Sequence, residues 1–288
     1  MQISIVTPSY NQAHFLEHTI RSVLDQGYDN LEYVVIDGGS TDGSVEIIKK
    51  YQSQLAYWLS EPDKGHGNAL NKGFRQTTGE IMAWLNSDDL YFPWTLRTVS
   101  EIFATHPEID WITGINTIRD DQGRLIDVFP NYKNKYDYLL GRFWIQQEST
   151  FWRRSIWEAT GGYIDEGYKF MVDGELWTRF FLREPLYHVR CALGGFRDSG
   201  VNRSRANMDA CLEEMRRCTA TMERSSDHKT LSNLAHLRRV VALPRGVASN
   251  LYRKMLHFSV PSLSTDTAYN LIAYSGGTWR HRTRAYFI

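Results

Sequence analysis

Along the first 115 residues, short apolar runs alternate with segments in which apolar side chains recur every three or four positions. The runs are typical of buried strands and lie at residues 3–7, 31–36, 56–59, 81–86 and 111–115. The segments between them are typical of helices and lie at residues 15–24, 45–51, 69–76 and 96–103. Strands that alternate with helices, the first two starting about 28 residues apart, predict an α/β fold with a parallel sheet.

The rest of the chain divides into two further parts. Residues 116–205 lose the strand–helix rhythm and are rich in aromatic side chains, so we expect them to shape a second ligand site. Residues 206–288 have the pattern of a helical extension with loops, interrupted by Pro244, Pro261 and Gly276-Gly277. We therefore expect one large domain over residues 1–205, followed by this C-terminal helical extension.

The composition is that of a folded protein. Of the 288 residues, 42% are hydrophobic and 23% charged, which excludes a disordered, collagen-like or coiled-coil chain. The three cysteines form no CxxC pair and are too few for a secreted disulfide framework. The sequence shows no basic segment followed by an apolar stretch at its start, and no window of 18 consecutive apolar residues. We therefore expect a cytoplasmic protein without a membrane span.

Charge is distributed unevenly along the chain. Lys and Arg together number 33, as do Asp and Glu, but residues 228–288 carry a net charge of about +8, which leaves about −8 on the rest. A basic, amphipathic end suits peripheral contact with the anionic inner face of a membrane. Packing of the basic end on the acidic body explains the same pattern, and both interpretations stay open. No nucleic-acid-binding motif is present, so no nucleic acid is expected as a partner.

Polar residues follow three of the predicted strands, at residues 7–10, 37–40 and 86–89. Ligands of open parallel sheets bind beyond the carboxyl ends of the strands, so these three segments are expected to converge on one cleft. The adjacent carboxylates of Asp88 and Asp89 repel each other unless a cation compensates, which makes them a candidate divalent-metal and nucleotide site. The alternative is that one of them caps the following helix. The Walker and GxGxxG patterns are absent, which disfavours a P-loop NTPase or a dinucleotide dehydrogenase.

Four ordered motifs resemble glycosyltransferase family 2. They are IVTPSYNQ at 5–12, VIDGGSTDGS at 35–44, DKG at 63–65 with ALNKG at 69–73, and WLNSDDL at 84–90. The resemblance covers about residues 1–200 and fades after 115. It implies a GT-A fold, with a Rossmann-like, mostly parallel central sheet flanked by helices. It also implies a nucleotide-sugar donor, usually a UDP-sugar, bound with Mg²⁺ or Mn²⁺ by residues 1–115, and an acceptor bound by residues 116–205.

The family's donor-binding residues can be carried over onto this chain. The resemblance implies that Thr7 and Asp37 contact the base and that the rest of the donor set is Pro8, Ser9, Tyr10, Gly39, Lys64, Asn86, Ser87 and Asp88. Asn86 departs from the family, which has an aspartate at the first position of its DxD region. An amide is a poorer metal ligand than a carboxylate, so we expect the cation on Asp88 or Asp89. Lys64 is alternatively a solvated loop lysine.

Residues 170–177 carry the expected catalytic base. Asp173 occupies the place of the family's catalytic aspartate, although Val172 stands where an acidic residue is usual. In the inverting mechanism that the resemblance implies, this carboxylate takes the proton of the acceptor hydroxyl. Glu175 is the second candidate, and a helix N-cap is the structural alternative for Asp173. Weaker candidates for the acceptor or diphosphate are Gln147, Glu148, His188 and Arg197, for each of which an ordinary structural role is the alternative.

The expected function is a metal-dependent inverting glycosyltransferase that moves a sugar from a nucleotide diphosphate donor to a hydroxyl of a saccharide or lipid-linked saccharide. Surface polysaccharide biosynthesis is the setting that the resemblance implies. One alternative is a catalytically inactive GT-A module that binds nucleotide or sugar, motivated by Asn86 and Val172. A second is a sugar-phosphate nucleotidyltransferase, which normally has a Gly-rich loop with Arg or Lys after its first strand. Residues 8–11 do not have that composition.

Overall fold

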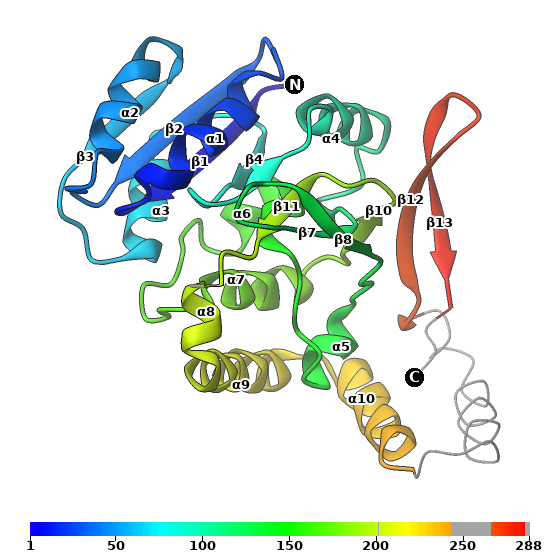
Figure 1. Ribbon diagram of the computed structural model, residues 1–288. Helices are drawn as coiled ribbons and strands as arrows, with labels where there is room; N and C mark the ends of the chain where they lie inside the picture. Colours follow the sequence, from blue (N-terminus) through cyan, green and yellow to red (C-terminus); the bar gives the residue numbers. More distant parts are fainter. Residues whose placement is uncertain (201, 244–265, 286–288) are drawn as a thin grey trace.

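The computed structural model describes residues 1–200, 202–243 and 266–285. Within these ranges the chain forms a mixed α/β fold in which a large central sheet is flanked by helices (Figure 1). The basic residues Arg245, Arg253 and Lys254 of the C-terminal extension lie outside the described residues.

In the described residues the central sheet has nine strands, in the order β13-β12-β10-β6-β9-β4-β1-β2-β3. The bounds are β1 (Ile3–Ser9), β2 (Leu31–Asp37), β3 (Tyr57–Ser60), β4 (Ile81–Trp84), β6 (Trp111–Thr113), β9 (Thr150–Arg153), β10 (Tyr187–Val189), β12 (Tyr269–Ser275) and β13 (Thr278–Arg284). β9 runs antiparallel to both of its neighbours and β13 runs antiparallel to β12, whereas the other pairs are parallel. The mostly parallel sheet that the sequence predicts is therefore confirmed.

Helices follow the strands of the first half, as the apolar spacing predicts. They are α1 (Ala13–Leu24), α2 (Ser44–Tyr51) with the 3₁₀ turn η1 (Gln52–Gln54), α3 (His66–Phe74) and α4 (Thr95–Thr105). Each turns an apolar stripe to the sheet, so burial of that stripe holds the helix in place. α3 approaches β1 so closely that a Cβ atom at Gly73 would clash with Val6, which explains a glycine inside a helix.

The second half adds a smaller sheet and the helices of residues 116–206. Among the described residues this sheet has the order β5-β11-β7-β8. Its strands are β5 (Leu90–Tyr91), β7 (Asn116–Arg119), β8 (Leu125–Phe129) and β11 (Gly194–Arg197). The helical segments are α5 (Lys135–Leu139), η2 (Gln147–Ser149), α6 (Arg154–Ala159), α7 (Val172–Phe181) and α8 (Arg203–Ala206).

Tryptophans from both halves of the domain meet in one core. Trp84 of β4 stacks on Trp177 of α7 with ring centroids 5.8 Å apart, and Trp111 stacks on the other side of Trp177 at 5.6 Å. Trp152 of β9 packs edge-on against Trp84 at 5.6 Å. All four side chains are fully buried, so they join α7 to the sheet.

The C-terminal extension begins as two helices, α9 (Met208–Ser225) and α10 (His228–Val241), and the structure then differs from the helical expectation. Residues 269–284 form the hairpin β12–β13, which joins the central sheet beside β10. Gly276 and Gly277, with φ of +63° and +82°, make its two-residue turn. Ile272 and Trp279 anchor it to the core. The sequence of β13, TWRHRTR, has few apolar residues, so the alternation of apolar and polar positions that indicates a strand is not visible in it.

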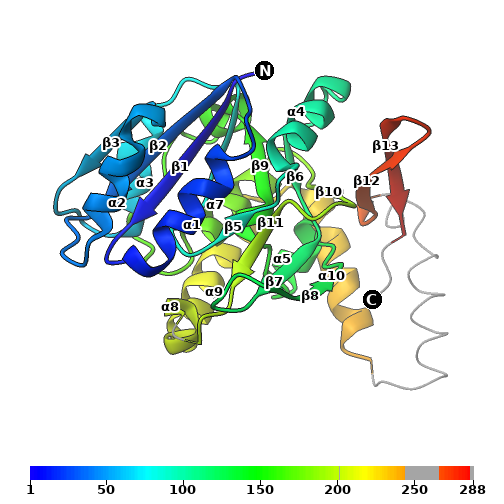
Figure 2. The same cartoon turned by 45° about the horizontal axis from the view of Figure 1, so that its top comes forward.

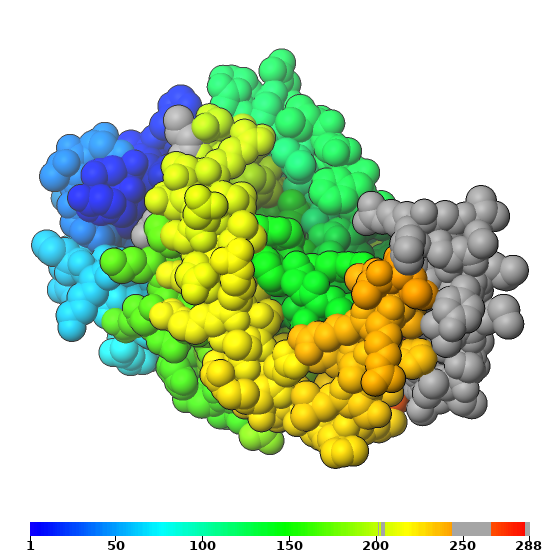
Figure 3. Space-filling view, turned by 90° about the horizontal axis from the view of Figure 1, so that it is seen from below, coloured from blue at the N-terminus to red at the C-terminus, as the bar shows by residue number. Residues whose placement is uncertain are grey.

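α9 and α10 cover much of the face seen in Figure 3. The apolar side of α10 is buried through Leu234, Leu237 and Val240, and Arg238 pairs with Glu223 of α9 at 2.6 Å. The amphipathic pattern of α10 is thus explained by packing on the body of the protein. In the part of the chain that the structure describes, no helix has both the length and the hydropathy needed to cross a bilayer.

Candidate functional site

A cavity of about 930 Å³ lies beyond the carboxyl ends of β1, β2 and β4. β1 and β2 run in the same direction and end at the same edge of the sheet (Figure 2). The expected site residues that line the cavity are Pro8, Ser9, Tyr10, Asn86, Ser87, Asp88, Asp89, Gln147, Glu148 and Asp173. The structure therefore brings residues from both halves of the domain to one place.

Thr7 lies at the end of β1 but does not line the cavity. Its side chain is fully buried, and its hydroxyl lies 3.0 Å from the hydroxyl of Tyr33 on β2. Pro8, Ser9 and Tyr10 follow it and face the cavity, Tyr10 with an exposed ring. Thr7 thus links β1 to β2 below the cavity, and the three residues that follow it line the cavity.

Asp37 organises its own loop. Its two carboxylate oxygens accept hydrogen bonds from the backbone N–H groups of Gly39 and Ser40 and from the hydroxyls of Ser40 and Ser60, at 2.5–3.1 Å. The side chain is fully buried, and Gly38 is the loop residue that lines the cavity. Gly39 has φ of +82° beside Pro62, a conformation that favours glycine. Asp37 therefore shapes this wall of the cavity from behind.

Lys64 is exposed at the rim, between Asp63 and Gly65, which both line the cavity. The next residue is a site residue that sequence reasoning missed: His66, at the start of α3, also lines the cavity. Its Nε2 lies 3.1 Å from Oδ1 of Asn86. The sequence feature that could have identified His66 is its position directly after a Gly-containing loop, at the start of a predicted helix.

Asn86 and Asp89 are held in the cavity wall by hydrogen bonds. Nδ2 of Asn86 donates to Oδ2 of Asp89 at 3.2 Å, and the backbone N–H of Arg197 donates to Oδ1 at 2.9 Å. Both aspartates line the cavity, but Asp89 is only 1% exposed, whereas Asp88 is half-buried. Neither aspartate caps α4, whose N-cap is Trp94, so the capping alternative is wrong.

Burial raises the pKa of both aspartates above the ordinary value, and the charges of Asp88 and Glu148 raise that of Asp89 further. A divalent cation would offset the repulsion between these buried carboxylates and so stabilise their ionised forms. Over residues 1–200, 202–243 and 266–285 no cluster of three or more His, Cys, Asp or Glu could hold a metal by itself. Carboxylate oxygens that leave room for phosphate and water are nevertheless the donor set that suits Mg²⁺ or Mn²⁺.

Asp173 is the second residue of α7 and faces the cavity. The N-cap of α7 is Met171, so the N-cap alternative for Asp173 is wrong. Burial raises the pKa of its carboxyl to about 6, although hydrogen bonds from the backbone at Gly174 and Asp173 act in the opposite direction. Val172, where the family usually has an acidic residue, is 2% exposed and packs in the core.

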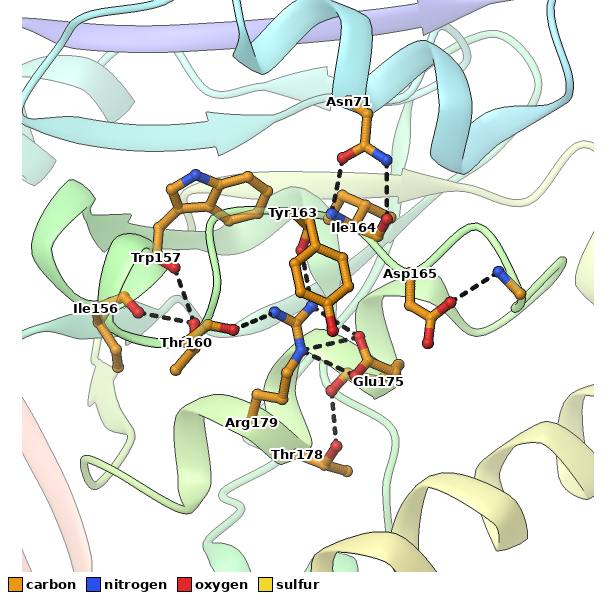
Figure 4. A network of polar contacts seen from close by, with 11 residues as sticks. Asn71, Ile156, Trp157, Thr160, Tyr163, Ile164, Asp165, Glu175, Thr178 and Arg179 are labelled. Carbon is orange, nitrogen blue, oxygen red and sulfur yellow. Dashed lines mark hydrogen bonds and ion pairs between the residues drawn. The ribbon is translucent and has the colours of Figure 1, made fainter.

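Glu175, the second candidate for the base, does not line the cavity. Its carboxylate accepts from Arg179 one turn later at 2.8 Å, as Figure 4 shows. The same guanidinium donates to the main-chain oxygens of Thr160 and Tyr163, both at 2.8 Å. Arg179 thereby holds the loop after α6, and Glu175 orients its guanidinium. The charge of Glu175 is already paired inside the fold.

Gln147 and Glu148 reach the cavity from η2, where they are almost fully buried. Nε2 of Gln147 donates to the carbonyl of Trp84 at 2.6 Å. Burial, chiefly, raises the pKa of Glu148 to about 8, so its carboxyl is largely protonated at neutral pH. Oε1 of Glu148 has no hydrogen-bond partner within the described ranges. Such a group can bond to a ligand that enters the cavity.

His188 and Arg197 do not line the cavity, so neither is placed to neutralise a diphosphate there. Nε2 of His188 lies 2.9 Å from the backbone nitrogen and 2.8 Å from the oxygen of Lys133, and burial lowers the pKa of His188 to about 4. Arg197 is fully buried. Its Nε donates to the carbonyl of Asp88 at 2.5 Å and its Nη1 to that of Asp121 at 2.6 Å. It acts on the site by holding the Asp88-Asp89 turn.

Sequence reasoning missed several other residues that line the cavity in the second half. They include Asn116, Trp144, Lys169, Phe170 and Asn202. Trp144 is 43% exposed, which is unusual for a tryptophan and leaves an aromatic face at the cavity. Asn116 begins β7 and the others lie in loops, all in segments without a periodic pattern, so no local signal in the sequence identified them.

Comparison with curated proteins points to one activity. An uncharacterized glycosyltransferase of Nostoc sp. is 35% identical over 130 residues, which span 44% of this chain and 40% of that protein. An uncharacterized glycosyltransferase of Rickettsia typhi is 28% identical over 250 residues, which span 81% of this chain and 78% of that protein. The first match covers less than half of the Nostoc protein, whereas the second covers most of both chains.

Solved structures share the fold. S. aureus TarS 1–349 in complex with UDP-GlcNAc superimposes with a TM-score of 0.67 at 17% identity, over 93% of this chain and 82% of that one. A mannosyltransferase from Pyrobaculum calidifontis in complex with GDP-Man and Mn²⁺ gives a TM-score of 0.50 at 17% identity, over 92% and 86% of the two chains. Residues 4–160 match the sequence profile of "Glycosyl transferase family 2". The chain belongs to this family, and the protein is a glycosyltransferase with the expected GT-A-like fold.

Proposed function

We propose that the protein is a metal-dependent, inverting glycosyltransferase that transfers a sugar from a UDP-sugar to a hydroxyl of a saccharide or lipid-linked saccharide. Surface polysaccharide biosynthesis is the proposed setting. The observation that carries this proposal is the shared cavity, where the polar ends of β1, β2 and β4 meet Asp173 of α7. The UDP-GlcNAc complex of TarS supports the uridine donor, and GDP-mannose is the competing donor to test.

The donor half of the proposed site is residues 1–115. Pro8, Ser9, Tyr10, Gly38 and the rim around Lys64 would surround the nucleotide. Thr7, Asp37 and Gly39 would contribute by shaping the ends of β1 and β2, because Thr7 and Asp37 are bonded within those strand ends and Gly39 packs beside Pro62. Asn86 and Ser87 would meet the ribose or the sugar, since amides and hydroxyls hydrogen-bond to sugar hydroxyls.

Asp88 is the proposed principal ligand of Mg²⁺ or Mn²⁺, with Asp89 behind it. Asp88 is half-buried and faces the cavity, whereas the oxygens of Asp89 already accept from Asn86 and Arg197. Such cations are commonly held by one or two carboxylates together with substrate phosphates and water, which fits a protein that offers no larger cluster in its described residues. When bound, the cation would neutralise charge on the leaving diphosphate.

Asp173 is the proposed catalytic base. Its carboxylate would take the proton of an acceptor hydroxyl while that oxygen bonds to the anomeric carbon of the donor sugar. The bond from that carbon to the diphosphate oxygen breaks, and its electron pair leaves with the nucleoside diphosphate. Attack from the opposite face inverts the configuration at the anomeric carbon. The raised pKa of about 6 makes Asp173 a stronger base than an exposed aspartate.

The acceptor half is proposed for residues 116–205. Trp144 can stack on a sugar ring, and Gln147 and Glu148 supply polar groups at the floor of the cavity. Residues 206–288 would follow as the extension, although α9 also packs against α7. Peripheral membrane contact is proposed for the hairpin β12–β13, where Arg280 and Arg282 are exposed.

The test is a thermal-shift screen of nucleotide sugars with and without Mn²⁺, followed by assays of donor hydrolysis and transfer. A ligand that binds only the native state raises the melting temperature, so UDP-sugars with Mn²⁺ are expected to give the largest rise. Donor consumption by the wild type, lost in Asp173→Asn, supports the transferase. A UDP-induced shift without any donor consumption would instead identify an inactive nucleotide-binding module.

A further inference from the structure

Glu214 of α9 holds the loop that leads to the proposed base. Its Oε1 accepts from the backbone N–H of Lys169 at 2.9 Å, and its Oε2 accepts from those of Phe170 and Met171, both at 2.9 Å. All three loop residues line the cavity, and Asp173 follows two residues after Met171. One carboxylate thus accepts from three consecutive backbone N–H groups of the loop that leads into α7, whose N-cap is Met171.

Neighbouring residues of α9 hold the same segment on either side. Nη2 of Arg217 donates to the carbonyl of Gly167 at 2.9 Å, and the Arg217 guanidinium lies 3.9 Å from the ring centroid of Tyr168. Met215 packs so closely on Gly174, the residue after Asp173, that a Cβ atom there would clash with it. α9 therefore contacts the chain on both sides of Asp173, and it lies below α7 in Figure 1.

We propose that Glu214 is a positioning residue for the transfer reaction, which fixes the 169–171 loop and through it the place of Asp173 at the start of α7. Glu214 does not line the cavity, so it does not act on the substrate; it holds the loop, and its charge also raises the pKa of Asp173. A base that must lie within hydrogen-bond reach of an acceptor hydroxyl tolerates little displacement, since a misplacement of about 1 Å can cost about 100-fold in rate. The effect of Glu214 on the transfer rate rests on the proposed function, whereas its hold on the 169–171 loop does not.

The experiment compares Glu214→Gln with Glu213→Gln in the full chain. A glutamine side chain has one acceptor oxygen, so it leaves at least one of the three N–H groups without its bond. Glu213 is the matched control, because its side chain is 74% exposed and pairs only with the exposed Arg216 among the described residues. Hydrogen exchange at residues 169–171 is measured together with kcat and KM for the nucleotide sugar.

In Glu214→Gln, exchange at residues 169–171 is expected to accelerate at least about tenfold, because local opening becomes easier. We also expect kcat to fall at least about tenfold while KM for the donor stays within about twofold, since the proposed donor residues lie at the ends of strands in the first half and not on the 169–171 loop. Glu213→Gln is expected to match the wild type in all three quantities. Unchanged exchange, or a kcat equal to that of the wild type, would overturn the proposal.

Two further measurements separate this inference from failures elsewhere. The nucleotide-induced rise in melting temperature shows whether each variant keeps a folded donor half. If Glu214→Gln does not fold, Glu214→Asp, which keeps the charge on a shorter side chain, is expected to show the same faster exchange and lower kcat. If the wild type consumes no donor, the proposed function fails, but the exchange data still decide whether Glu214 holds the loop.

Discussion

The backbone N–H of Arg197 donates a hydrogen bond to Oδ1 of Asp89 at 2.9 Å, across 108 residues of sequence. The guanidinium of the same arginine bonds to the carbonyl of Asp88 and lies 4.7 Å from the ring centroid of Phe15 on α1. A fully buried cation therefore supports the turn that carries both proposed metal-binding carboxylates. The site depends on residues that never touch its ligands.

Arg197→Gln is expected to lower the free energy of unfolding by about 3 kcal/mol, because it removes the charged donor that bonds to the carbonyls of Asp88 and Asp121 and leaves buried acceptors unsatisfied. Urea unfolding measures this loss. Arg124→Gln is the control: Arg124 is exposed and pairs with Asp120 at 2.7 Å, so a change within about 0.5 kcal/mol is expected. Equal stabilities of the two variants would show that the buried guanidinium is not needed.

Asp88→Asn is expected to remove most of the Mn²⁺-dependent part of the thermal shift produced by UDP, since an amide is a weaker ligand for a hard cation than a carboxylate. The metal-independent part of the shift should persist, because the proposed nucleotide-binding walls come from β1 and β2. Melting curves with UDP, with and without Mn²⁺, measure both parts. Asp209→Asn, an exposed change on α9, is the control. A full Mn²⁺-dependent shift in Asp88→Asn would contradict the metal assignment.

The rate of transfer is expected to fall as the pH drops below about 6. Burial raises the pKa of Asp173 to about 6, so its carboxyl binds a proton at a higher pH than an exposed aspartate does. The base must be unprotonated to accept the hydroxyl proton, and kcat/KM should therefore decrease about tenfold per pH unit below that value. Initial rates between pH 4.5 and 8 measure this limb. Asp173→Asn should abolish transfer and retain UDP binding, and substantial transfer by this variant would exclude Asp173 as the base.

Glu148→Gln is expected to make the protein more stable at alkaline pH. The folded-state pKa of Glu148 is raised to about 8 from an ordinary 4.5, so the native state holds a proton that the unfolded chain releases. The stability contributed by this proton is fully present below pH 4.5 and is lost as the pH rises through about 8. A glutamine carries no such penalty, so the melting temperature of Glu148→Gln should exceed that of the wild type at pH 8.5. A smaller difference is expected at pH 5, and an equal difference at both values would refute the protonated state.

Much of the first half could be predicted because its information is local. Apolar runs followed by amphipathic helices indicate a parallel sheet, and parallel strands end at one edge, so the convergence of residues 7–10, 37–40 and 86–89 followed from the pattern. Adjacent acids at Asp88 and Asp89 indicated the metal-binding role that we propose. These conclusions needed only the spacing of residues within about 30 positions.

Tertiary structure decided how each polar group is used. Asp37 and Glu175 have the right chemistry for a ligand site, but the first is bonded within its own loop and the second pairs with Arg179. The sequence could not show this, because the direction of a side chain depends on what packs around it. The hairpin β12–β13 likewise became recognisable only through its pairing with β10, which lies about 80 residues earlier in the chain.

The sequence by itself determined the strand–helix order, the family and the segments in which the chemistry resides, because periodicity and motifs are local properties of the chain. Only the folded structure decided that Arg197 supports the Asp88-Asp89 turn, that Glu148 is buried beside it and that Glu214 holds the loop before Asp173. Each of these relationships joins residues that are distant in sequence. They arise when helices and strands pack and bury charged groups together, which no short segment specifies alone.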